Sequence, residues 1–187
     1  MKNKSCILGV IAAILAWTVI AISWKLNPWF NFFEHAFSDL GTQKANKPWI
    51  YNYGLIATGI MIILYSACTY RFALNKMEAV GAGFLFIAGI FLSLIGVYPG
   101  GTRPHVFVST WFFIQMDMAI IALGLGLLMR AIWRTGFIVT LLGILAFPIY
   151  IAVDYIVGWP SVAVGEAYGI VIIDIAVILI VYEQVKS

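Results

Sequence analysis

Six long runs of apolar residues follow one another along the chain, and shorter polar segments separate them. The runs cover residues 6–24, 49–70, 79–98, 105–129, 136–157 and 161–182. A helix needs about 20 consecutive apolar residues to cross the hydrocarbon core of a bilayer. The runs have about this length, and none shows the strict alternation that is typical of a membrane β-strand. The pattern predicts an all-α, polytopic membrane protein, with six transmembrane helices forming one domain over residues 1–187.

The connections between the later runs are short, whereas the connection between the first two runs is long. Short connections favour antiparallel neighbours, so we expect a compact up-down bundle. The long connection contains the sequence PWFNFFEHAFSDL over residues 28–40. On a helix, one of its faces would be apolar (Phe30, Phe33, Phe37 and Leu40) and the opposite face polar (Asn31, Glu34, His35 and Ser38). This pattern predicts a short amphipathic helix at the membrane interface, acting as an anchor or as a lid.

The composition agrees with a membrane location and excludes other classes of protein. Apolar residues make up 63% of the 187 residues and charged residues 10%, whereas a soluble domain has about 25% charged residues. A soluble globular enzyme is therefore excluded. The net charge is only +3, and the cations are scattered along the chain, so no nucleic acid is expected as a partner. Membrane lipids are the expected partners, and a homo-oligomer is left open.

The distribution of cations favours one orientation in the membrane. With a cytoplasmic N-terminus, seven cations lie inside (Lys2, Lys4, Arg71, Lys76, Arg130, Arg134 and Lys186) and four lie outside (Lys25, Lys44, Lys47 and Arg103). Cytoplasmic loops carry the excess of Lys and Arg, so we predict a multi-pass protein of the cell membrane with both termini in the cytoplasm. Cys6 and Cys68 then lie on the reducing side, and no disulfide is expected.

Polar side chains gather on the predicted external face, where they suggest a pocket. Its candidate catalytic residues are Asp39, His105 and Ser38, and its candidate binding residues are Glu34, His35, Arg103, Asn52, Asp154 and Glu166. Asp39 and His105 would act as an acid–base pair, or as metal ligands together with Glu34, His35 or Glu166. The nucleophile would be Ser38 or Ser109. Two further acids, Asp117 and Asp174, lie in the middle of their spans. Charge inside a bilayer is costly and usually marks function, although an inter-helix hydrogen bond would also explain these acids.

Three motifs carry a resemblance to a known family. They are FSDLG at residues 37–41, YNYGLIATG at residues 51–59 and GVYPGGTRPH at residues 96–105. Together they resemble the domain-of-unknown-function 998 family of six-span microbial membrane proteins. The matching positions are Ser38, Asp39, Leu40, Gly41, Asn52, Gly54, Leu55, Gly59, Pro99 and His105. The family is also distantly similar to the Frag1/DRAM/Sfk1 group, and this similarity implies a link to lipid handling.

Four hypotheses about function follow. The first is a lipid-binding or lipid-processing protein whose polar pocket lies at the extracytoplasmic face. The second is a small transporter, or an ion- or proton-conducting protein, that uses Asp117 and Asp174. The third is a redox module that holds haem between His35 and His105, and the fourth is a structural protein without a ligand. We favour the first, and the sequence leaves open whether the protein is an enzyme and whether it binds a metal or another cofactor.

Overall fold

A computed structural model describes residues 4–186 of the chain, with side chains from Cys6 onward. Its long helices are α1 (Leu8–Leu26), α2 (Pro48–Arg71), α3 (Lys76–Val97), α4 (His105–Met129), α5 (Trp133–Ile156) and α6 (Val162–Lys186). Two 3-10 helices, η1 (Lys4–Ile7) and η2 (Phe37–Gly41), complete the elements of the described range, which contains no strand. All six long helices are long and apolar enough to cross a membrane. The predicted all-α fold with six spans is therefore confirmed.

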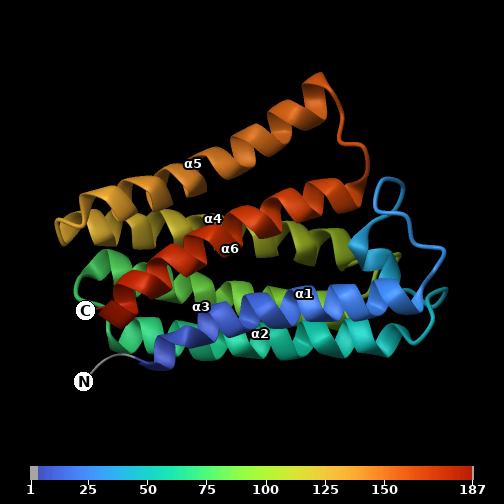
Figure 1. The fold of residues 1–187 in the computed structure, drawn as a ribbon, viewed down its shortest axis with the longest axis horizontal. Helices are drawn as coiled ribbons and strands as arrows, with labels where there is room; N and C mark the ends of the chain where they lie inside the picture. Colours follow the sequence, from blue (N-terminus) through green and yellow to red (C-terminus); the bar gives the residue numbers. More distant parts are fainter. Residues whose placement is uncertain (1–3, 187) are drawn as a thin grey trace.

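The long helices run in roughly the same direction, apart from the C-terminal half of α5 (Figure 1). Helix α2 packs against α1 and α3, α3 packs against α4, and α6 contacts both α1 and α4. Helix α5 packs mainly on α4, and its C-terminal half tilts away from the other helices (Figure 1). Both ends of the described chain lie at one end of the bundle, which we call the termini end. The opposite end, with the connection 27–47, is the loop end.

Small residues allow α2 and α3 to approach closely. A Cβ atom on Gly59 would lie 2.5 Å from the carbonyl oxygen of Gly89, and a Cβ atom on Gly89 would lie 2.7 Å from the carbonyl oxygen of Gly59. Ser93 lies on the same face of α3, and its hydroxyl donates to the Gly89 carbonyl oxygen at 2.9 Å. Such contacts between small residues are how membrane helices gain packing energy, because lipid supplies no hydrophobic driving force between them.

The connection 27–47 does not form the helix that the sequence predicts over residues 28–40. It consists of turns up to Ala36, followed by the five-residue η2. The side chains of Asn31 and His35 accept backbone hydrogen bonds from Phe33 (3.0 Å) and Asn31 (2.9 Å), and such bonds compete with those of a helix. Phe37 is only 2% exposed. The segment therefore folds over the end of the bundle instead of lying flat on its surface.

The expectation that the two cysteines remain free is wrong. Helix η1 places Cys6 beside the last turns of α2, where it forms a disulfide with Cys68, and the two Cα atoms lie 5.6 Å apart. This separation is within the range that a disulfide requires. The expectation rested on the compartment alone, whereas the pairing depends on how the chain folds before α1. Both cysteines are buried.

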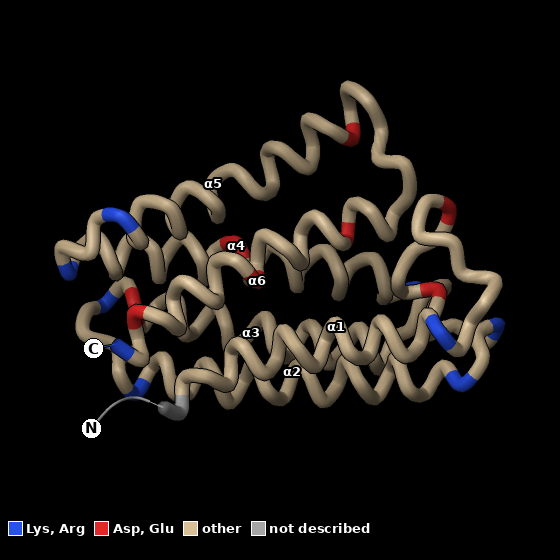
Figure 2. Tube along the Cα trace, viewed as in Figure 1, with Lys and Arg blue, Asp and Glu red and all other residues tan. Residues whose placement is uncertain are grey.

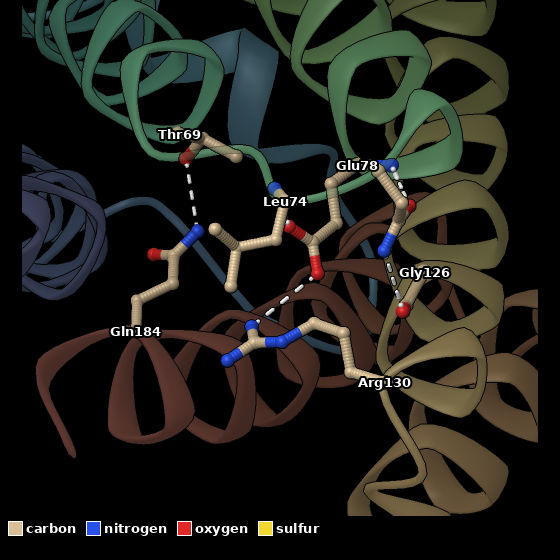
Figure 3. Close-up of polar contacts among 7 residues, drawn as sticks. Thr69, Leu74, Glu78, Gly126, Arg130 and Gln184 are labelled. Atoms are coloured by element: carbon tan, nitrogen blue, oxygen red, sulfur yellow. Dashed lines mark hydrogen bonds and ion pairs between the residues drawn. The ribbon is translucent and has the colours of Figure 1, made fainter. Parts of the chain in front are cut away.

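Polar side chains at the termini end bind one another (Figure 3). Glu78, buried at the start of α3, pairs with Arg130 at 3.3 Å and accepts a hydrogen bond from the backbone N–H of Leu74 at 2.7 Å. Asn75 accepts a hydrogen bond from the Glu78 N–H at 3.0 Å and donates to the carbonyl oxygen of Gly126 at 2.9 Å. These contacts join the α2–α3 turn to the C-terminal end of α4.

The last turns of α6 are bound to the same end of the molecule. Gln184 donates a hydrogen bond to the Thr69 hydroxyl of α2 at 3.2 Å (Figure 3). The hydroxyl of Thr135 on α5 donates to the Glu183 carboxylate at 2.6 Å. Side-chain bonds therefore tie α6 to two other helices at the termini end.

Candidate functional site

Two cavities lie within the described part of the bundle and meet near its loop end. The axial cavity, of about 100 Å³, lies between α1, α2, α3, α4 and α6. The lateral cavity, of about 380 Å³, lies between α4, α5 and α6. Five residues line both cavities and define what we call the junction: Ser38, His105, Ser109, Phe113 and Glu166. Three predicted site residues are therefore brought together here, namely Ser38, His105 and Glu166.

The axial cavity has mostly apolar walls and extends from the junction toward the termini end. Gly9, Ala12, Ala13 and Ala16 line it on α1, and their small side chains leave space along that helix. Asp174 is one of its few polar lining groups, and its carboxylate accepts a hydrogen bond from the Trp17 indole N–H at 2.7 Å. The predicted inter-helix hydrogen bond is thus present for Asp174.

His105, the first residue of α4, lines both cavities and has a hydrogen-bond partner for one of its two ring nitrogens. Its Nδ1 lies 2.8 Å from the carbonyl oxygen of Tyr98. A carbonyl oxygen only accepts hydrogen bonds, so Nδ1 carries the proton, and Nε2 of the neutral ring is an acceptor. Within the described part of the chain, Nε2 has no hydrogen-bond partner, although the side chain is only 8% exposed. His105 can therefore bind a donor or accept a proton inside the junction.

Hydrogen bonds to α6 hold η2 and the connection before it over the junction. Glu166 accepts a hydrogen bond from the Phe37 N–H at 2.7 Å. The Ser161 hydroxyl donates to the carbonyl oxygen of Phe32 at 2.6 Å, and the Ala163 N–H donates to that of His35 at 2.9 Å. These bonds place Ser38, which is 8% exposed, in the wall of both cavities.

The three sequence motifs meet at the loop end and mostly hold one another in place. The Asn52 side chain donates to the carbonyl oxygen of Gly41 at 3.0 Å. A Cβ atom on Gly100 would lie 2.9 Å from the carbonyl oxygen of Ser38, so glycine allows the α3–α4 turn to approach η2. The Asp39 carboxylate accepts a hydrogen bond from the Ala36 N–H at 2.9 Å and so caps η2. Most motif residues therefore build the scaffold around Ser38 and His105.

Several predicted site residues line neither cavity: Asp39, Glu34, His35, Arg103, Asn52 and Asp154. The His35 ring lies against Trp29 and Phe30, and its Nδ1 binds the backbone of its own turn. The cavities therefore bring His105 together with Ser38 and Glu166, and not with His35 or Asp39. Among the described residues, no group of three or more His, Cys, Asp or Glu side chains is arranged to hold a metal ion.

The lateral cavity contains residues that the sequence did not single out. Tyr150 of α5 and Tyr168 of α6 line it, and both rings contact Trp159, with centroids 5.5 Å and 5.4 Å away. A Cβ atom on Gly165 would lie 2.9 Å from the Tyr150 ring, and one on Gly169 would lie 2.6 Å from the Phe113 ring. The glycines thus make room for aromatic walls. Aromatic residues near a membrane boundary are expected as an interfacial belt, so their positions alone gave no signal.

Six membrane-length helices and a helical fold over the described residues define a polytopic membrane protein. The family described as "Protein of unknown function (DUF998)" matches residues 10–182, and the chain belongs to this family. No curated protein and no solved structure matches the chain. The more distant resemblance to the Frag1/DRAM/Sfk1 group is not shown and stays a prediction.

Proposed function

We propose that this protein binds a membrane amphiphile, with the polar head at the junction and the apolar chain in the bundle. One observation carries the proposal: the mostly apolar axial cavity and the more polar lateral cavity share His105, Ser38 and Glu166. An amphiphile needs such an arrangement. Burial of its chain against an apolar wall is favourable, whereas its head group needs hydrogen-bonding partners when it leaves water. Two cavities that share part of their lining meet both needs.

The junction also supplies chemistry that lipid processing would use. Nε2 of His105 can accept a proton from a hydroxyl group, and Ser38 and Ser109 line the same space. A general base acts on a proton within hydrogen-bond reach, at about 3 Å between heavy atoms. Binding of an amphiphile needs no proton transfer. Proton transfer by His105 would be needed only if the protein also processes the bound lipid.

We further propose that the loop end faces outward from the cell membrane and that both termini are cytoplasmic. Among the described residues, the helix ends and turns at the termini end carry more Lys and Arg than those at the loop end (Figure 2). The positive-inside rule supports this orientation. The disulfide at the termini end opposes it, since disulfides form more readily outside the cytoplasm, although burial shields both sulfurs. Labelling with an impermeant maleimide at Lys44→Cys and at Lys76→Cys, in a Cys6→Ser/Cys68→Ser background, decides the orientation.

The amphiphile proposal is tested by filling the axial cavity. Ala16→Phe places a ring where α1 leaves space, whereas Ile14→Phe places the same ring on the outer surface of α1, where Ile14 is 61% exposed. After purification in a mild detergent, native mass spectrometry measures the lipid retained per protein. We expect at least a tenfold loss in Ala16→Phe and no loss in Ile14→Phe. Equal retention in both variants, or no lipid on the unmodified protein, would contradict the proposal.

A second candidate function is transport of a proton or a cation. It is favoured by the placement of Asp117 in the lateral cavity and Asp174 in the axial cavity. Each lies twelve residues into its helix, which is about 18 Å at 1.5 Å per residue. Flux into liposomes should then fall in Asp117→Asn, and equal flux in this variant and the unmodified protein would remove this candidate.

A further inference from the structure

We infer that the lateral cavity binds a positively charged nitrogen, the ammonium head of an amphiphile. This inference rests on the proposed function and names the class of head group. The ionisable residues in the wall of the lateral cavity are Asp117, Glu166, His105 and two tyrosines, and no Lys or Arg lines it. Arg103, two residues before His105, is exposed and lines neither cavity. An anionic head would therefore face carboxylates without a compensating cation, which is unfavourable in a medium of low dielectric constant.

The two carboxylates have no cationic partner in the described part of the protein. The salt bridge recorded there joins Arg130 to Glu78 at the termini end. One carboxylate oxygen of Glu166 accepts the Phe37 N–H, and Asp117 accepts no hydrogen bond from the described residues. A charge withdrawn from water costs free energy unless it is paired, and charges within a membrane usually pair or mark a ligand path. A cationic ligand would supply the missing partner.

Two polar atoms that belong to largely buried residues at the junction have no hydrogen-bond partner among the described residues and are free to bind a ligand. His105 and Ser38 are each 8% exposed and line the cavity, and neither Nε2 of His105 nor Oγ of Ser38 has a hydrogen-bond partner in the described structure. Nε2 is an acceptor because Nδ1 holds the proton. Nε2 and the carboxylates are acceptors, and the Ser38 hydroxyl can accept a hydrogen bond as well as donate one. A primary ammonium group carries three donors and no acceptor, whereas a phosphate carries acceptors alone.

The remaining walls suit a cation and the first methylene groups attached to it. Phe113, Phe147, Tyr150 and Tyr168 contribute aromatic rings to the lining. The face of an aromatic ring attracts a cation within about 6 Å. A volume of about 380 Å³ also exceeds what an ammonium group alone would fill. The cavity therefore fits a head group with part of its chain.

The arrangement of α5 suggests that the ligand comes from the membrane and not from water. The C-terminal half of α5 tilts away from the bundle (Figure 1), and three of its residues form one wall of the lateral cavity: Ala146, Phe147 and Tyr150. The outer surface beyond this wall is apolar and exposed, as at Ile149 and Ile151. A single-chain or multi-chain amine in the bilayer could thus place its head in the cavity while its chain stays in an apolar environment.

The test compares probes that share a twelve-carbon chain and differ in the head group. The protein, purified in maltoside micelles at pH 7, is titrated with dodecylamine, dodecanol or dodecyl phosphate at equal mole fraction, and with propylamine as a free amine. The readout is the temperature of unfolding. We expect a saturable rise with dodecylamine and no rise with dodecyl phosphate. In Asp117→Asn and in Glu166→Gln, half-saturation should require at least ten times more dodecylamine.

Glu183→Gln is the matched control, because it removes a carboxylate from the same helix, α6, outside both cavities. It should bind dodecylamine as the unmodified protein does, and equal weakening in this variant would overturn the inference. Equal stabilisation by dodecanol or dodecyl phosphate would overturn the ammonium site but leave the amphiphile proposal standing. Saturation by propylamine at the same concentration would support the ammonium site and assign it to a free amine. Stabilisation by none of the probes would contradict both proposals.

Discussion

The Glu78 cluster at the termini end and the walls of the two cavities differ in how their polar groups are satisfied. At the termini end, Glu78 is held by Arg130 and by a backbone N–H, and Asn75 binds both α3 and α4. Near the loop end, Nε2 of His105 and Oγ of Ser38 have no partner among the described residues, and neither has Asp117 in the middle of α4. Satisfied polar groups stabilise a fold, and unsatisfied ones cost free energy. The Glu78 cluster thus stabilises the fold, whereas unpartnered groups in the cavity walls cost stability and, on the proposed function, serve binding.

The largest loss of stability is expected at the termini end, on removal of Glu78. Glu78→Ala leaves the Arg130 guanidinium without its partner and removes the bond to Leu74. Breaking a buried ion pair in this way should cost about 3–5 kcal/mol of unfolding free energy. Unfolding in detergent measures the change. Glu34→Ala, which removes an exposed acid, serves as the control, and equal effects of the two variants would contradict the comparison.

The disulfide should contribute the next largest effect. Cys68→Ser removes the disulfide, which joins residues 62 positions apart. Its loss should lower the unfolding free energy by about 2–4 kcal/mol. A reductant should destabilise the unmodified protein by the same amount and leave Cys68→Ser unchanged. An unmodified protein that unfolds identically with and without reductant would show that the link carries no stability.

Asp39 tests whether a motif residue acts as scaffold or as part of the site. Asp39→Ala removes the cap of η2, and loss of a cap typically costs about 1 kcal/mol. Binding of dodecylamine should persist, because Asp39 lines neither cavity. Loss of binding without loss of stability would instead restore the acid–base role that the sequence suggested.

The smallest effect on stability, and one of opposite sign, is expected at Asp117. Replacement of an unpaired carboxylate by an apolar side chain is often neutral or stabilising. Asp117→Leu should therefore leave the unfolding free energy unchanged or raise it by up to about 1 kcal/mol, while binding of dodecylamine is lost. A clear loss of stability would mean that Asp117 has a structural partner, and the contrast between the Glu78 cluster and the cavity walls would fail.

The spans could be predicted because each depends on local composition alone. About 20 apolar residues in succession have no other stable placement than a membrane or a core. His105, Ser38 and Glu166 could also be singled out, since polar groups beside apolar runs are rare. Their assembly could not be derived, because the Phe37–Glu166 bond joins residues 129 positions apart.

Other features depend on directions of side chains, which hydropathy does not encode. The sequence placed Asp39 beside His105, yet the carboxylate turns back to its own segment. The same limit applies to His35, whose Nδ1 binds the backbone at Asn31. The aromatic walls formed by Tyr150 and Tyr168 depend on the tilt of α5, and no local pattern specifies that tilt.

The outlying position of α5 makes one part of the protein adjustable. Residues of α1, α2, α3, α4, α6 and η2 line the axial cavity, and α5 contributes none, whereas Ala146, Phe147 and Tyr150 of α5 line the lateral cavity. On the proposed function, substitutions in α5 would therefore change the size of the accepted head group without disturbing the axial cavity. On the proposed function, α5 would then be a place where head-group choice can evolve, or be engineered, with little effect on the chain site.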